Sequence, residues 1–186
     1  FLPNSRAGIQ QLAEAMNLTL KEVQERIEGL SEFNPMLGMR GVRLGITVPE
    51  IYEMQARAIF EAVIDVAISC KQKVVPEIMI PLVSAKREVE LVKSSIDSVA
   101  KQVSEESGQD IDYKLGVMVE TPRAALRAGE ISKDVSFFSF GTNDMTQMTY
   151  GLSRDDAGRF MSNYVSQGVF EEDPFHILDR DGVGEL

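Results

Sequence analysis

Residues 114–144 read KLGVMVETPRAALRAGEISKDVSFFSFGTND. The segment 114–120 is a short apolar run, 123–132 has the composition of a short helix, and 135–142 is a second apolar run rich in aromatic residues. Short apolar runs bounded by turn residues predict buried strands. Two such strands joined through a helix predict parallel pairing. We therefore predict a β-α-β unit here, with polar residues following each strand.

The same alternation extends through much of the chain. It predicts further strands near residues 41–46 and over 74–83. Helices with one apolar face are predicted over 49–68, 87–105 and 154–165. In the first helix the predicted buried stripe is Ile51, Met54, Ala58, Ala62 and Val66. In the second it is Val89, Val92, Ile96, Val99 and Val103.

Apolar strands that alternate with helices indicate an α/β protein with a parallel sheet. Two architectures fit, an open doubly wound sheet and part of a (β/α)8 barrel. No G-x-G-x-x-G motif follows any predicted strand, which disfavours a dinucleotide-binding sheet. We count about four β/α units, whereas a complete barrel needs eight. Since half a barrel leaves two sheet edges unpaired, we expect the chain to be a fragment of a barrel domain.

The first 33 residues have a different character from the rest of the chain. Thr19 precedes a helical pattern and Glu22 follows three residues later, which is the spacing of a capping box. We expect residues 1–33 to form a helical insertion and residues 34–186 to supply the central β/α units of one domain.

Composition limits the classes of partner. The chain has 186 residues, of which 44% are hydrophobic, enough for a real core. The net charge of −10 argues against a nucleic-acid partner, because phosphate backbones select basic surfaces. No apolar run approaches the roughly 20 residues that cross a bilayer, so we expect no membrane partner. Cys70 is the only cysteine and excludes an internal disulfide, and no targeting signal is visible, so the compartment stays unassigned.

Two carboxylates follow neighbouring predicted strands. Glu120 ends the strand over 114–120, and Asp144 follows the strand over 135–142 next to Asn143. Parallel β/α folds place such residues on one face, where their chemistry occurs. Hard oxygen ligands of this kind suit Mg²⁺, which leaves positions for water and substrate oxygens. The alternative is that both carboxylates only cap the helices that follow them.

Two further features suit an anionic ligand. Arg40 lies between glycines in GMRGVR, and its planar donor fork matches phosphate or carboxylate, although a surface ion pair is the simpler reading. The turn Gly141-Thr142-Asn143 can offer backbone N–H groups to an anion. His176 and Cys70 have no motif partners, and we interpret them as packing or surface residues.

Several blocks resemble the phosphoenolpyruvate/pyruvate-binding domain of the pyruvate phosphate dikinase family, from about Leu18 to Leu186. They are NPMLGMRGVRLG, VVPEIMIPLV, GVMVETPRAAL, FFSFGTNDMTQMTYGLSRDDAGRF and DPFHILDRDGVGEL. The phosphoenolpyruvate synthase family and enzyme I of the sugar phosphotransferase system share a thinner version of the pattern. The segment MTYGLSRDD and the last block favour the dikinase family.

This resemblance implies a (β/α)8 barrel in which Glu120 and Asp144 hold Mg²⁺. It further implies that Arg40 binds the phosphoryl or enolate end of the substrate, and that Gly141, Thr142 and Asn143 bind it through backbone and amide groups. The implied reaction interconverts pyruvate, ATP and phosphate with phosphoenolpyruvate, AMP and diphosphate. A phosphohistidine domain of the same protein would deliver the phosphoryl group, and the complete protein would be a homodimer in the cytoplasm, a chloroplast or a glycosome.

The family's acid/base cysteine lies in a later segment that this sequence does not contain, and Cys70 does not match it. The phosphohistidine and nucleotide-binding domains are likewise not in the sequence. We therefore expect the 186-residue chain to be inactive by itself. The alternatives are a phosphoenolpyruvate synthase or enzyme I relative, and a noncatalytic module that binds metal and carboxylate.

Overall fold

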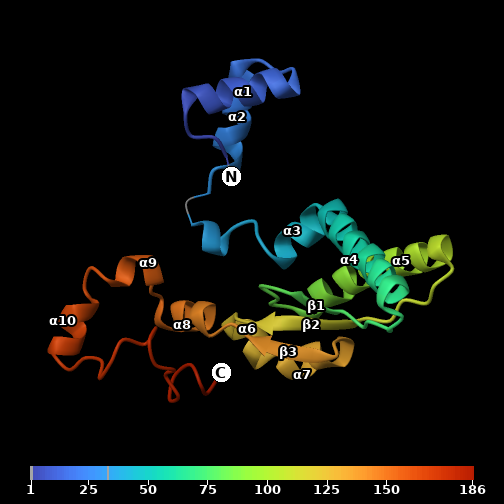
Figure 1. Ribbon diagram of the computed structural model, residues 1–186. Coiled ribbons are helices and arrows are strands. Elements are labelled where there is room, and N and C mark those ends of the chain that lie inside the picture. The colour runs from blue at the N-terminus through green and yellow to red at the C-terminus, as the bar shows by residue number, and fades with distance from the viewer. Residues whose placement is uncertain (1, 33) are drawn as a thin grey trace. The chain divides into compact units, whose positions relative to one another are not determined.

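The computed structural model describes residues 2–32 and 34–186 (Figure 1). The chain divides into two compact units, residues 1–39 and 40–186. Within the described ranges, none of the helices has the length and apolar character needed to span a membrane.

The first unit is helical, as its sequence predicts. It contains α1 (Arg6–Met16), α2 (Leu20–Leu30) and the short 3-10 helix η1 (Pro35–Leu37). The capping box at the start of α2 is present: the Thr19 hydroxyl accepts from the Glu22 N–H, and the Glu22 carboxylate accepts from the Thr19 N–H. Ala13 and Val23 are buried between these helices.

The second unit is built on a parallel sheet of three strands in the order β1-β2-β3 (Figure 1). These are β1 (Glu77–Ile80), β2 (Lys114–Val119) and β3 (Phe137–Phe140). In register, Ile80 lies opposite Val117, and Val119 lies opposite Phe140. The central strand is the most deeply buried, with Leu115, Val117 and Val119 in the core. The three strands confirm the predictions over 74–83, 114–120 and 135–142.

Two long helices, α4 (Pro49–Cys70) and α5 (Lys86–Ser107), pack against each other. The predicted stripe of α5 is confirmed, since all five of its valine and isoleucine residues are buried. The predicted stripe of α4 is wrong. Its buried residues are Ala56 and Phe60, whereas Met54 is 62% exposed. The ring of Phe60 makes an edge contact with Tyr113, which explains why this face turns inward.

The strand predicted near 41–46 is also wrong, because these residues form a short helix, α3 (Val42–Thr47). Gly41 precedes it with a φ of +56°, and the Thr47 hydroxyl donates back to the Arg43 carbonyl, a contact made within one helical turn. The described part of the chain therefore contains three strands rather than the four that the sequence predicts.

The remaining helices are short and lie between and after the strands. The helix predicted over 123–132 is divided into α6 (Pro122–Leu126) and α7 (Ala128–Ile131), followed by the 3-10 helix η2 (Ser132–Asp134). After β3 comes α8 (Thr142–Tyr150). The single helix predicted over 154–165 is wrong, since α9 (Arg154–Ala157) and α10 (Met161–Ser166) are separate.

Candidate metal and substrate site

Three segments meet where the parallel strands end. They are the loop after β1, which we call the β1 exit loop (residues 81–85), Glu120 directly after β2, and the first turn of α8 after β3. The Gly141 N–H donates to the Val119 carbonyl at 3.0 Å, which extends the β2–β3 pairing to the point where α8 begins. The predicted convergence of the strand ends is therefore observed.

Glu120 is a buried carboxylate with only 6% of its surface exposed. Its Oε1 accepts from the Leu82 N–H at 2.7 Å. Burial, together with hydrogen bonding to Asp144, raises the pKa of Glu120 to about 7. The Leu82 N–H and the charge of Arg40 act in the opposite direction on this pKa. Two carboxyl groups thus lie together with too little positive charge to balance them, an arrangement that a divalent cation would relieve.

Asp144 is half-buried in the first turn of α8, and its position depends on Gln147 one turn later. The Gln147 Nε2 donates to Asp144 Oδ1 at 3.3 Å, and the Gln147 Oε1 accepts from the Arg154 N–H at 2.8 Å. Gln147 is itself buried. The amide side chain therefore connects Asp144 to the start of α9.

Asn143 is exposed at the start of α8, and its Oδ1 accepts from Arg154 Nη1 at 2.9 Å. Sequence reasoning missed both Gln147 and Arg154. Gln147 lies three residues after Asp144, which places both on the same helix face. Arg154 lies eleven residues after Asn143, and no local pattern connects them.

Arg40 is exposed, and its charge acts on the Glu120 carboxyl group. The following residues connect it to the β1 exit loop, because the Val42 N–H donates to the Pro81 carbonyl at 3.0 Å. The structure therefore brings Arg40, Glu120 and Asp144 to one edge of the sheet, with Gly141, Thr142 and Asn143 directly before or within the first turn of α8.

The alternative role as a helix cap fails for Glu120. The Thr121 hydroxyl caps α6 by accepting from the Ala124 N–H at 3.2 Å, while the Glu120 side chain bonds across to Leu82. No side-chain hydrogen bond caps α8 at Gly141. Within residues 2–32 and 34–186, no group of three or more His, Cys, Asp or Glu side chains gathers as a metal cluster. The oxygen donors that lie together at this site are the carboxylates of Glu120 and Asp144.

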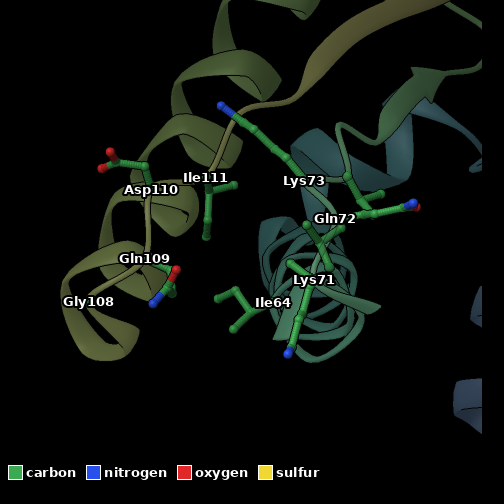
Figure 2. Close-up of a pocket in the computed structure, with 11 residues that line it drawn as sticks. Ile64, Lys71, Gln72, Lys73, Gly108, Gln109, Asp110 and Ile111 are labelled. Atoms are coloured by element: carbon green, nitrogen blue, oxygen red, sulfur yellow. The ribbon is translucent and has the colours of Figure 1, made fainter. Parts of the chain in front are cut away.

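Cys70, His176 and two cavities are the other features considered as candidate sites. Cys70 is exposed. His176 is exposed too, and it lines a cavity of about 170 Å³ together with Asn143 and Arg154. A wider cavity of about 460 Å³ lies between the ends of α4 and α5, where Ile64 and Ile111 face its centre (Figure 2). This cavity lies at the N-terminal ends of the strands, whereas Glu120 lies at their C-terminal ends. Its lining contains no carboxylate pair.

A parallel sheet of three strands with helices between them, and with Glu120 and Asp144 following neighbouring strands, defines an α/β domain. The chain belongs to the family of PEP-binding domains of PEP-utilising enzymes, whose family model matches residues 10–186. It is 53% identical to pyruvate, phosphate dikinase of Rhizobium meliloti and 51% identical to that of Clostridium symbiosum, over its entire length. It is also 53% identical to pyruvate, phosphate dikinase 1, chloroplastic, of Arabidopsis thaliana. The chain spans 21% of the length of the first two relatives.

Proposed function

We propose that the chain is the part of a pyruvate, phosphate dikinase that binds phosphoenolpyruvate and pyruvate. The observation that carries this proposal is the buried Glu120 beside Asp144 at the ends of neighbouring parallel strands. Identities of 50 to 53% with relatives of that name, each over the whole chain, support the same assignment. The three β/α units would then be a portion of a (β/α)8 barrel, since active sites of such barrels lie at this end of the strands.

Glu120 and Asp144 would hold Mg²⁺, and the residues present fit this ion. Magnesium is commonly held by one or two carboxylates and keeps several oxygen ligands from water and substrate. The unbalanced charge of this carboxylate pair is the physical reason to expect a cation here. When bound, the ion would stabilise negative charge on the enolate and carboxylate oxygens of the substrate.

The chain's other residues would bind and orient the anion. Arg40 would face the phosphoryl group, because a guanidinium presents a fork of donors that matches phosphate oxygens. The uncapped N–H groups at the start of α8 would donate to the substrate carboxylate, as helix N-termini do for anions. Asn143, held by Arg154, would present its amide nitrogen toward the ligand. Positioning and charge stabilisation then account for what this domain contributes to phosphoryl transfer.

The partners follow from the same assignment. The phosphoryl group would come from a phosphohistidine domain of the same protein, and the complete protein would be a homodimer. The acid/base group for the methyl carbon of pyruvate would lie outside these residues, so the 186-residue chain would bind but not turn over its substrate.

Phosphate dependence of the complete protein tests the proposal. Formation of phosphoenolpyruvate from pyruvate and ATP should require inorganic phosphate and release diphosphate. Activity without added phosphate would favour the phosphoenolpyruvate synthase alternative. Absence of turnover together with retained Mg²⁺ binding would favour a noncatalytic binding module.

A further inference from the structure

Residues 81–84 of the β1 exit loop are each hydrogen-bonded to the segments around Arg40 and Glu120. The Pro81 carbonyl accepts from the Val42 N–H at 3.0 Å, and the Leu82 N–H donates to Glu120 at 2.7 Å. The Val83 carbonyl accepts from the Thr121 hydroxyl at 2.9 Å, and the Ser84 carbonyl accepts from the Arg123 guanidinium. A loop bonded in this way has little freedom to reorient.

One residue in this loop has an unusual backbone. Leu82 has a φ of +59° and is 4% exposed. A large non-glycine residue with positive φ is uncommon, and such conformations persist only where the surroundings enforce them. The Pro81 carbonyl and the Leu82 N–H belong to one trans peptide and point in opposite directions, toward Val42 and Glu120. The φ of Leu82 sets the orientation of this peptide relative to Val83, whose carbonyl is bound to Thr121. Two neighbouring groups of the loop therefore point at the segments that supply Glu120 and Arg40.

Gly41 completes this contact from the other side. A Cβ atom at Gly41 would lie 2.9 Å from the Pro81 carbonyl oxygen and 3.0 Å from the Leu82 Cβ. Gly41 itself has a φ of +56°. The backbone next to Arg40 thus comes close to Pro81 and Leu82, the part of the β1 exit loop that is hydrogen-bonded to Glu120.

We propose that Leu82 is a positioning residue whose left-handed backbone fixes the Glu120 carboxylate and the Arg40 segment in register with each other. The inference rests on the proposed function, because it assigns Leu82 a role in metal and substrate binding at that site. The proposed role belongs to the backbone of Leu82 rather than to its side chain. Its effect passes through the N–H to Glu120 and through the adjoining Pro81 carbonyl to Val42.

Two substitutions at Leu82 separate positioning from packing. If core packing decides, Leu82→Val should be less damaging than Leu82→Gly, because valine retains most of the buried apolar volume. If the left-handed backbone decides, Leu82→Gly should be less damaging than Leu82→Val, because glycine adopts positive φ freely and β-branched residues avoid it. We expect Leu82→Val to weaken binding of Mn²⁺, used as a probe for Mg²⁺, by about tenfold, the scale at which lost outer partners affect metal sites. Leu82→Gly should bind Mn²⁺ more tightly than Leu82→Val although it melts at a lower temperature.

The measurement is Mn²⁺ binding by electron paramagnetic resonance in the complete protein, with thermal melting and the KM for phosphoenolpyruvate measured alongside. Gly41→Ala provides a second test that does not alter Leu82, and it should weaken Mn²⁺ binding and raise this KM. Gly108→Ala is its control, since Gly108 has a φ of +67° but nothing within 4 Å of an added Cβ. Gly108→Ala should leave Mn²⁺ binding unchanged.

Each outcome decides the inference. If Leu82→Val binds Mn²⁺ as tightly as the wild type, or if Mn²⁺ affinity follows melting temperature across the Leu82 pair, Leu82 is only a core residue. If Leu82→Gly does not fold, the comparison of Mn²⁺ binding between Gly41→Ala and its control Gly108→Ala decides the inference. Asp144→Asn distinguishes failure of the proposed site: unchanged Mn²⁺ affinity in this variant would reject the metal site itself. Loss of Mn²⁺ affinity in Asp144→Asn, with normal Mn²⁺ binding in the Leu82 and Gly41 variants, would reject only the positioning role of Leu82.

Discussion

A Cβ atom added to Gly141 would lie 2.6 Å from both the Cβ and the Oε2 of Glu120. Gly141, after β3, therefore lies directly against the Glu120 side chain, after β2. A residue larger than glycine at position 141 would clash with that side chain. The φ of Gly141 is −86°, so close approach rather than backbone conformation requires glycine here. This contact explains how a buried carboxylate can lie beside the first turn of α8.

Gly141→Ala should displace the Glu120 side chain. We expect a loss of about 1–3 kcal/mol in the free energy of unfolding, as for other overpacked sites, together with much weaker Mn²⁺ binding. Urea unfolding and Mn²⁺ titration would measure the two effects. Gly129→Ala is the control, because nothing lies within 4 Å of its added Cβ. Normal Mn²⁺ affinity in Gly141→Ala would mean that Glu120 is not a ligand.

Asp144→Asn removes one charge while keeping the shape and the acceptor for Gln147. We expect Mn²⁺ affinity to fall by about 100-fold, the upper end of the loss seen when even outer partners of a metal site are removed. Circular dichroism should show an unchanged fold. The exposed Asp155 provides a matched control, and Asp155→Asn should bind Mn²⁺ normally.

Arg154→Lys tests the residue that holds Asn143. Lysine keeps the charge but lacks the planar fork, so the bond to Asn143 Oδ1 should be lost. Because the loss of a hydrogen bond to a charged group costs roughly 1.5–3 kcal/mol, we expect the KM for phosphoenolpyruvate to rise by about tenfold. Mn²⁺ affinity should change little, because Arg154 does not contact either carboxylate through its guanidinium. Equal loss of both affinities would contradict this division of roles.

Asp179 makes stability depend on pH. Its carboxylate accepts from the N–H groups of Asp181, Gly182 and Val183 and from the Tyr150 hydroxyl, and these bonds lower the pKa of Asp179. The folded state therefore favours the charged form, so the stabilisation is present above the unfolded pKa and is lost as the pH falls through the lower folded value.

We expect Asp179→Asn to cost about 1 kcal/mol in the free energy of unfolding at pH 7, the typical net contribution of a hydrogen bond. The difference between variant and wild type should shrink below pH 3.8, the ordinary pKa of aspartate. Urea unfolding of the 186-residue chain at pH 7 and below pH 3.8 measures this difference. A difference that grows toward acid pH would contradict this assignment.

Phe60→Ala tests which face of α4 is buried. The ring is fully buried, and its removal should cost about 3–5 kcal/mol in the free energy of unfolding. Met54→Ala, on the exposed face, should change it by no more than about 0.5 kcal/mol. Comparable losses in urea unfolding would mean that another surface covers Met54.

The sequence predicted the convergence of Glu120 and Asp144 better than it predicted some of the helices. Glu120 and Asp144 were predictable because each follows an apolar strand, and parallel strands end on the same edge of a sheet. The buried face of α4 was not predictable, because that helix is apolar on two faces and its tertiary contacts with α5 and Tyr113 select one of them. The segment 42–47 has a strand-like composition, but its helical start depends on Gly41 and on a hydrogen bond to Pro81, far along the chain. Arg154 was missed for the same reason, since its partner is set by tertiary structure.

The hydrogen bonds of the β1 exit loop to Glu120 and Thr121 each join residues that are 38 positions apart in the chain. Contacts of this kind form only after the intervening segment has closed into a loop, which costs entropy before it yields any stabilisation. The helices, whose hydrogen bonds are local, can therefore begin to form before the carboxylate pair has its final geometry. During refolding, recovery of cation affinity should lag behind recovery of helical circular dichroism, which makes the metal site a reporter of the last stage of assembly.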